Sequence, residues 1–384
     1  MTKRFGAVRC TAVCLLISAA PRTHGQNIIG GGSAPLPISG SPFADGSSVG
    51  SFLINVLGNN PTTSIKFKLE DVLTQEPTPN FLIASPSNGT TPARVTVAAN
   101  PNVTRTMPPG RYVAGLKFAS VDQSPPSSTL VTVVLTLDAP APPGIGAVVN
   151  TASFQPVITP GSLVSIFGES LGPPVRAANY DSSGRYPTAF GNTTVTLNGV
   201  AAPLLYVSPS QINAIVPGSL AGQKSAQVIV SRYGASSNTF SVPVSETSPA
   251  IFTYTPEGST QGAPLNYRFP NIYTPNSVEN PAAPGSVVVL FATGAGVWEE
   301  EGANGAMAGN IGLAARPFTA KPVSLTIGGQ PSRLIYAGAA PYQSLGMLQI
   351  NAYVPEGIGP GLQPVVLKVD NLDNTQQQAM IAIR

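Results

Sequence analysis

The chain has 384 residues, which is enough for roughly two to four domains. Hydrophobic residues make up 42% of the chain and charged residues only 10%. This composition excludes a chain that stays disordered for want of apolar residues. Four of the 20 basic residues fall within the first 25 positions. Without them 16 basic residues face 17 acidic ones, a balance that gives no support to nucleic-acid binding.

Residues 1–25 are expected to be a secretory signal peptide. A basic start is followed by the short apolar run CTAVCLLISAA, and the small residues of THG come before Gln26. Both cysteines, Cys10 and Cys14, and the only histidine, His24, lie in this segment. We therefore expect the exported chain to have no disulfide, no thiol nucleophile, no histidine base and no His or Cys metal ligand. No later run reaches the ~18 apolar residues of a membrane span, so we expect a periplasmic, cell-surface or extracellular protein without a transmembrane segment.

Residues 26–138 are expected to form a first β-sandwich. Five segments alternate apolar and polar positions and are rich in β-branched residues, which is typical of strands: SFLINVL, SIKFKLE, ARVTVAA, RYVAGLKFA and TLVTVVLTL. Turn-forming stretches such as SPSNGTTP separate them. The Pro-rich stretch DAPAPPGIG then predicts a linker at residues 139–146. No segment shows a helical period of useful length, so the sequence predicts an all-β protein.

After the linker the chain repeats itself. PGSLVSIFGESLG from Pro160 corresponds to PGSVVVLFATGAG from Pro284, and TLNGVAAPLLY, ending at Tyr206, corresponds to TIGGQPSRLIY, ending at Tyr336. QINAIVP and QINAYVP follow, and SAQVIVS then corresponds to QPVVLKV. Because the blocks keep their order while the spacing grows, they predict two copies of one domain, at 147–245 and 246–384.

The repeated heptads QINAIVP (211–217) and QINAYVP (349–355) could be a ligand motif used twice or a scaffold built twice. In a strand the alternate apolar residues share one face, and they are the same in both copies. The single difference, Ile215 against Tyr353, lies on the opposite face. We therefore favour a scaffold, in which the shared residues point into each core: Ile212, Ala214 and Val216 in copy 1, and Ile350, Ala352 and Val354 in copy 2.

These blocks also carry a family resemblance. PGSLVSIFGESLG, VTLNGVAAPLLYVSPSQINAIVP and AQVIVSRYGASSNTFSVPV resemble the IPT/TIG-type immunoglobulin-like domain. The span from VVNTASF to the C-terminus, about residues 145–384, is similar to the Solibacter-type uncharacterised C-terminal region of many secreted acidobacterial proteins. NGTTPARVTV, PPGRYVAGLKF and VTVVLTL resemble BACON-type sandwiches. The resemblances imply three immunoglobulin-like β-sandwiches in tandem on an exported or surface protein, and no defined activity.

Two short motifs mimic catalytic sites. SIFGESLG contains G-x-S-x-G around Ser170, and GSSVG around Ser48 matches the same pattern. A hydrolase elbow needs a following helix and a histidine, which the exported chain lacks, and copy 2 has Gly294 in place of Ser170. The G-x-G of VVVLFATGAGVW lacks the third glycine of a dinucleotide fingerprint, because Glu299 stands there. We expect turns at these places and no enzyme.

Acidic residues remain as candidate metal ligands. Carboxylates in a loop could bind Ca²⁺, although a solvated acidic turn is the commoner outcome, and a glycosidase pair of carboxylates stays open as a further alternative. The candidates form one run and one loop: Glu299, Glu300 and Glu301, and Asp370 and Asp373 in DNLDNT.

Aromatic residues gather in the third predicted domain. Exposed rings there would bind sugars or proteins at low entropic cost, whereas packed rings would close one end of the sandwich or fill the seam between domains. The candidate binding residues are Tyr254, Tyr267, Phe269, Tyr273 and Trp298. The sequence as a whole predicts a non-catalytic structural or adhesive protein, whose partner is a protein or polysaccharide at the cell surface or in the matrix. A carbohydrate-binding module is the first alternative.

Overall fold

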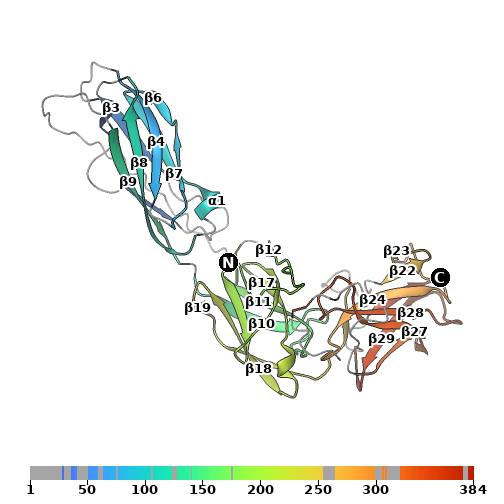
Figure 1. The fold of residues 1–384 in the computed structure, drawn as a ribbon. Helices are drawn as coiled ribbons and strands as arrows, with labels where there is room; N and C mark the ends of the chain where they lie inside the picture. The colour runs from blue at the N-terminus through green and yellow to red at the C-terminus, as the bar shows by residue number, and fades with distance from the viewer. Residues whose placement is uncertain are drawn as a thin grey trace, which may run out of the picture. The chain divides into compact units, whose positions relative to one another are not determined.

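The computed structural model describes residues 28–29, 36–40, 51–58, 64–74, 77–104, 107–122, 128–139, 141–173, 176–253, 264–298, 305–306, 308, 321–374 and 379–384. The predicted signal peptide lies outside them. The chain divides into two compact units, Met1–Pro140 and Ala141–Arg384, and the second unit holds both copies of the repeat (Figure 1). The helices of the described residues are the single turns α1 (Pro101–Thr104) and η1 (Gly218–Leu220), so the prediction of an all-β protein is confirmed. In the described part no helix is long and apolar enough to cross a membrane.

The first unit is a sandwich of two sheets. One sheet has the order β1-β3-β7-β5, with bounds Ile28–Ile29, Ser51–Gly58, Ala93–Ala99 and Leu82–Ser85. The other has the order β2-β9-β8-β4-β6, with bounds Leu36–Gly40, Ser128–Leu137, Gly110–Ser120, Lys66–Thr74 and Asn88–Thr90. Between them lie Phe67 and Phe118, whose rings meet edge to face with centroids 6.0 Å apart, and the fully buried Phe81.

Copy 1 of the repeat is a second sandwich. Its first sheet has the order β10-β11-β17-β16-β12, with bounds Gly144–Asn150, Leu163–Glu169, Gln211–Ile215, Leu204–Val207 and Arg176–Ala177. Its second sheet has the order β13-β14-β18-β19, with β15 and β20 as further partners; the bounds are Ala189–Phe190, Thr193–Leu197, Ser225–Arg232, Ala235–Ser236, Val200–Ala201 and Phe240–Pro243. β10 begins at Gly144, inside the stretch that the sequence predicts as linker.

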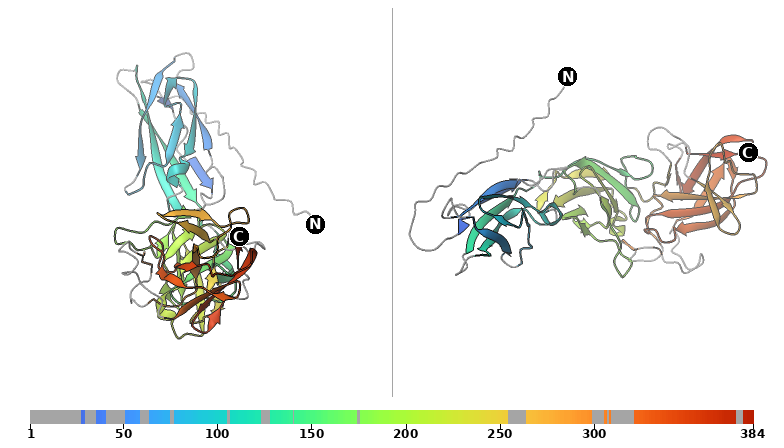
Figure 2. Two further views of the ribbon diagram at one scale, coloured as in Figure 1. Left: turned by 90° about the vertical axis from the view of Figure 1, so that its right-hand side faces the viewer. Right: turned by 90° about the horizontal axis from the view of Figure 1, so that it is seen from above.

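Copy 2 is a third sandwich, and Figure 2 shows its orange and red strands from two further sides. Its first sheet has the order β23-β22-β24-β28-β27, with β21 beside β24; the bounds are Ile272–Pro275, Leu265–Arg268, Val287–Thr293, Leu348–Tyr353, Leu334–Ala339 and Ala250–Ile251. Its second sheet has the order β26-β25-β29-β30, with β31 beside β29; the bounds are Gln330–Pro331, Val323–Ile327, Gly361–Val369, Leu372–Asp373 and Met380–Ile383.

The strand registers show that the two copies share one fold. β11 pairs with β17 so that Leu163 lies opposite Ile215, and β24 pairs with β28 so that Val287 lies opposite Tyr353. Both copies shift register at the same place in the next strand pair, at Leu204/Tyr206 and at Leu334/Tyr336. The prediction of tandem immunoglobulin-like sandwiches, the last two an internal repeat, is confirmed.

The heptads act as scaffold, as predicted. Every shared apolar residue is at most 1% exposed, and all belong to the core of their own copy: Ile212, Ala214, Val216, Ile350, Ala352 and Val354. The repeated polar residues have a structural role as well. The amide of Gln211 donates to Asn213 Oδ1 at 2.8 Å, and Gln349 donates to Asn351 Oδ1 at 2.9 Å, so each strand fixes its own outer face.

Candidate functional site

The two copies are joined by buried hydrogen bonds. The backbone N–H of Leu163 donates to Thr293 Oγ1 at 3.0 Å, and the Thr293 hydroxyl donates to the carbonyl of Gly346 at 2.8 Å. The N–H of Gly294 donates to Ser162 Oγ at 3.1 Å. Thr293 lies at the end of β24 and Leu163 at the start of β11. The end of one copy is therefore fixed onto the start of the other by polar groups that water does not reach.

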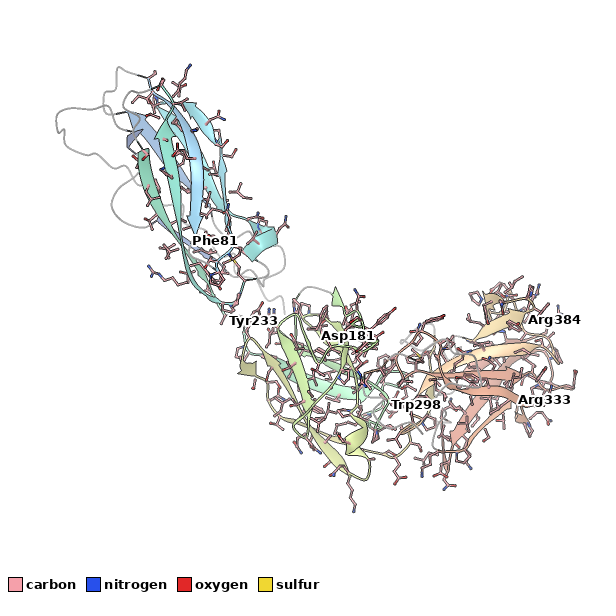
Figure 3. All side chains as sticks on the ribbon, viewed as in Figure 1. Phe81, Asp181, Tyr233, Trp298, Arg333 and Arg384 are labelled. Carbon is pink, nitrogen blue, oxygen red and sulfur yellow. The ribbon has the colours of Figure 1, made fainter. Side chains whose placement is uncertain are left out.

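The joint is close-packed around glycines and Trp298. A Cβ on Gly161 would lie 3.0 Å from the carbonyl oxygen of Gly296 and 3.6 Å from Trp298 Cδ1, and a Cβ on Gly346 would lie 3.0 Å from Leu163 Cδ2. Trp298 is 7% exposed and belongs to the copy 2 core; Figure 3 shows it on the side of copy 2 that faces copy 1. Trp298 therefore does not belong to an exposed contact surface, because packing at the seam buries its ring.

One outer-face residue of copy 1 is buried near the joint, although the sequence pattern predicts that it is exposed. Ile215 lies on the outer face of its strand, as its position in the heptad indicates, yet it is only 1% exposed. Its cross-strand partner Leu163 shares this face, and a Cβ on Gly346 of copy 2 would lie 3.0 Å from Leu163 Cδ2. The outer face of copy 1 next to Ile215 is therefore in contact with copy 2, although the alternation predicts an open face.

At the other end of β24 the corresponding outer face is partly exposed. Cross-strand partners share a face, and the registers align one row of four residues across the sheet: Tyr273, Tyr267, Val287 and Tyr353. Tyr273 is 49% exposed and the other three are half-buried. The guanidinium of Arg333 lies 4.1 Å from the ring centroid of Tyr353, a cation–π contact. We call these four residues, with Arg333, the tyrosine face.

The hairpin of β22 and β23 carries two rings of this face and a further ring at its tip. The ring centroids of Tyr267 and Tyr273 are 5.3 Å apart and their planes are inclined by 48°. Phe269, in the turn between the strands, is 86% exposed. Two of the five predicted binding residues therefore lie side by side, with Phe269 next to them in the chain, while Tyr254 lies outside the described residues.

Buried asparagines fix the base of this hairpin. Asn276 is fully buried; its Nδ2 donates to Asn266 Oδ1 at 3.0 Å and to the carbonyl of Ala382 at 2.9 Å, and its Oδ1 accepts from the N–H of Ala382 at 2.8 Å. Asn266 Nδ2 donates to the carbonyl of Asn280 at 2.7 Å. Figure 1 shows the hairpin beside the C-terminal end of the chain. Sequence reasoning missed these asparagines, whose only signal is their density after Leu265.

One described acidic candidate, Asp370, contacts a lysine. Lys321 Nζ lies 3.6 Å from Asp370 Oδ2 and 3.3 Å from Glu246 Oε2, and its hydrogen bond with Glu246 raises the pKa of Lys321 above its ordinary value. Asp373 is exposed in β30. Across the ranges that the structure describes, no three acidic, His or Cys side chains gather as a metal site. The calcium hypothesis gains no support from this loop, and Glu299, Glu300 and Glu301 lie outside the described residues.

Ser170 occupies a position that the fold requires to have positive φ. Its φ is 54°, and Gly294, at the same place in copy 2, has a φ of 83°. Leu171 beside it is fully buried, and β12 is the next element in the described residues. The backbone conformation of Ser170 therefore follows from the repeated turn at the end of β11 and β24. Ser48 and His24 lie outside the described residues.

Comparison with known proteins identifies the domain type of copy 1. Residues 150–242 match the family model of the IPT/TIG domain. The match lies within copy 1 and confirms the predicted IPT/TIG-like fold there; the registers of copy 2 repeat that fold. The resemblances to the Solibacter-type region and to BACON-type domains stay predictions. No curated protein matches the chain.

Solved structures give only distant similarities. The E. coli chaperone DraB is 16% identical over 56% of this chain and 97% of its own, with a TM-score of 0.21. Four extracellular cadherin domains of protocadherin gamma B7 are 11% identical over 94% of this chain and 76% of their own, with a TM-score of 0.20. Titin domains I67–I69 are 10% identical over 91% of this chain and 94% of their own, with a TM-score of 0.17. At such TM-scores none of them bears on function.

Proposed function

We propose that this is an exported, non-catalytic protein of immunoglobulin-like modules that mediates contacts at the cell surface or in the extracellular matrix. The observation that carries the proposal is the placement of the joint and the tyrosine face at opposite ends of β24. Thr293 ends the strand in a buried, hydrogen-bonded joint, while Val287 begins it between the half-buried Tyr267 and Tyr353, next to the exposed Tyr273. A rigid pair of sandwiches that presents rings to solvent suits display and adhesion.

The non-catalytic part of the proposal is supported by the chemistry of the candidate residues. The turn explains the conformation of Ser170 without a catalytic role, and Lys321 contacts the carboxylate of Asp370. The predicted loss of His24 with the signal peptide would remove the only imidazole.

Carbohydrate binding is less well supported than protein binding. A flat sugar platform needs coplanar rings, whereas the planes of Tyr267 and Tyr273 are inclined by 48° and Arg333 lies over the ring of Tyr353. Trp298, the largest ring of the predicted set, is buried.

The experiment has two parts. The chain is produced with its own first 25 residues and its location is followed by cell fractionation; we expect it outside the cytoplasm. Labelled purified protein is then added to cells that produce the chain, and bound label is counted for the wild type and for Phe269→Ser/Tyr273→Ser. We expect roughly tenfold less binding for the double variant, because exposed aromatic anchors dominate interface energies.

Phe154→Ser is the matched control, since Phe154 is an exposed phenylalanine of copy 1 that lies off the tyrosine face. Cytoplasmic retention, or a double variant that binds as well as the wild type, would contradict the proposal.

A further inference from the structure

The row that forms the tyrosine face has a covered counterpart in copy 1. Asn150 of β10 pairs with Val164 of β11, and Asn266 of β22 pairs with Val288 of β24, which lies 124 positions after Val164. β10 and β22 therefore hold the same place in their sheets, and so do β11 and β24. In copy 1 the outer-face residue Leu163 is buried against Gly346 of copy 2. The same chain therefore shows that this outer face can be covered by another sandwich of the same fold. In copy 2 the row at the start of β24 is exposed at Tyr273 and half-buried at its other three residues.

The partner of the open face cannot dock end-on as copy 2 does on copy 1. In copy 1 the pairing of β10 with β11 ends at Asn150 and Val164, so the N–H of Leu163 is left to donate to Thr293. In copy 2 the pairing of β22 with β24 includes one more pair, Tyr267 with Val287, and Val287 is the residue that corresponds to Leu163. Tyr267 therefore occupies the place that Thr293 takes in the joint. Addition of a strand at the edge of β23 is also disfavoured, because Pro275 has no N–H to offer. What remains is a contact across the face itself.

The chemistry of the face favours a protein partner. Tyrosine, phenylalanine and arginine are enriched at the centres of protein interfaces, and the face combines tyrosines with Arg333 while Phe269 stands at the hairpin tip. The inclined rings and the covered ring of Tyr353 suit side chains that interdigitate better than a flat sugar.

Charges at the margin of the face are self-complementary. Arg333 is exposed over Tyr353, and Glu356 is exposed beside Gly285, two residues before Val287. Within the described ranges neither side chain forms an ion pair. A surface that carries both a cation, Arg333, and an anion, Glu356, beside the tyrosine row can bind its own copy across a two-fold axis, the commonest symmetry of homo-oligomers.

We propose that the tyrosine face binds the tyrosine face of a second copy of this chain, with Arg333 opposite Glu356 of the partner subunit. This inference rests on the proposed function, because it names the partner of the same surface: the contact is between like molecules. The two-fold axis forms the pair of Arg333 and Glu356 twice, once on either side of the paired tyrosine faces.

The test is sedimentation velocity of the purified protein over about a hundredfold range of concentration, since a dimer forms by mass action. We expect a concentration-dependent dimer for the wild type. Phe269→Ser/Tyr273→Ser should raise the dissociation constant by about tenfold or more, and Phe154→Ser should leave it unchanged. Circular dichroism of each variant checks that it folds like the wild type.

A charge exchange makes the test specific to the proposed geometry. Arg333→Glu and Glu356→Arg should each weaken self-association, because like charges then meet across the axis, whereas an equimolar mixture of the two variants should form a heterodimer of restored affinity. A wild type that stays monomeric at every concentration, or a mixture without rescue, would overturn the inference. A monomer that still binds cells lacking the protein would overturn the dimer and leave the proposed function standing. A monomer retained on insoluble polysaccharide, with retention lost in Tyr273→Ser, would assign the face to a glycan instead.

Discussion

Replacement of Thr293 by valine tests the joint between the two copies. The change keeps the shape of the side chain and removes one hydroxyl, which accepts from the N–H of Leu163 and donates to the carbonyl of Gly346. Both backbone groups are buried, so both would lose their partner. An unsatisfied buried polar group costs about 1–3 kcal/mol, and two of them should cost roughly 2–5 kcal/mol of unfolding free energy.

Differential scanning calorimetry measures this effect, because residues 1–140 form a separate unit that serves as an internal reference. For a unit of this size we expect the transition of residues 141–384 to fall by roughly 4 to 20 °C while that of the first unit stays in place. Thr326→Val, a half-buried threonine of β25, is the matched control and should shift neither transition by more than about 2 °C. If Thr293→Val behaves like the control, buried hydrogen bonds do not hold the joint and the reasoning is wrong.

Three further predictions concern the core, the repeated turn and alkaline pH. Ile350→Ala should lower the unfolding free energy of the second unit by about 2–5 kcal/mol in urea titrations, because it opens a cavity in the copy 2 core. Gly294→Ser should lower the unfolding free energy by about 3 kcal/mol or more, since its Cβ would overlap the carbonyl of Ser248 at a position of positive φ. Ser170→Gly should change the unfolding free energy by no more than about 1 kcal/mol. Equal effects of the two variants would show that the two turns leave the same space for a side chain, which would contradict this reasoning. The raised pKa of Lys321 means that its ion pairs contribute fully below the ordinary lysine pKa of 10.5 and are lost as pH rises through the raised value. Unfolding curves across that range should therefore show a slope that Lys321→Met reduces, while the remaining slope comes from tyrosines such as Tyr186, whose pKa is raised by burial. A slope in the variant equal to that of the wild type would contradict this.

The strands were predictable because their signal is local. The segment ARVTVAA is β7 residue for residue. The inward face of each heptad could be assigned because apolar residues recur at every second position. The candidate surface was predictable only in part. Tyr267, Phe269 and Tyr273 are close in sequence, so their clustering could be foreseen, but Trp298 has the same composition signal and is buried. Tyr353 and Arg333 were missed because they join the row through pairing across β24 and β28.

The sequence by itself determined the fold class, the repeat and the inward face of each copy, since these follow from periodicity and from blocks that recur in order. Only the tertiary structure decided which outer faces remain open. Ile215 and Tyr353 hold the same place in their heptads, yet Ile215 is buried whereas Tyr353 is half-buried beneath Arg333. The physical reason is that exposure depends on contacts between residues more than a hundred positions apart, which no local pattern encodes.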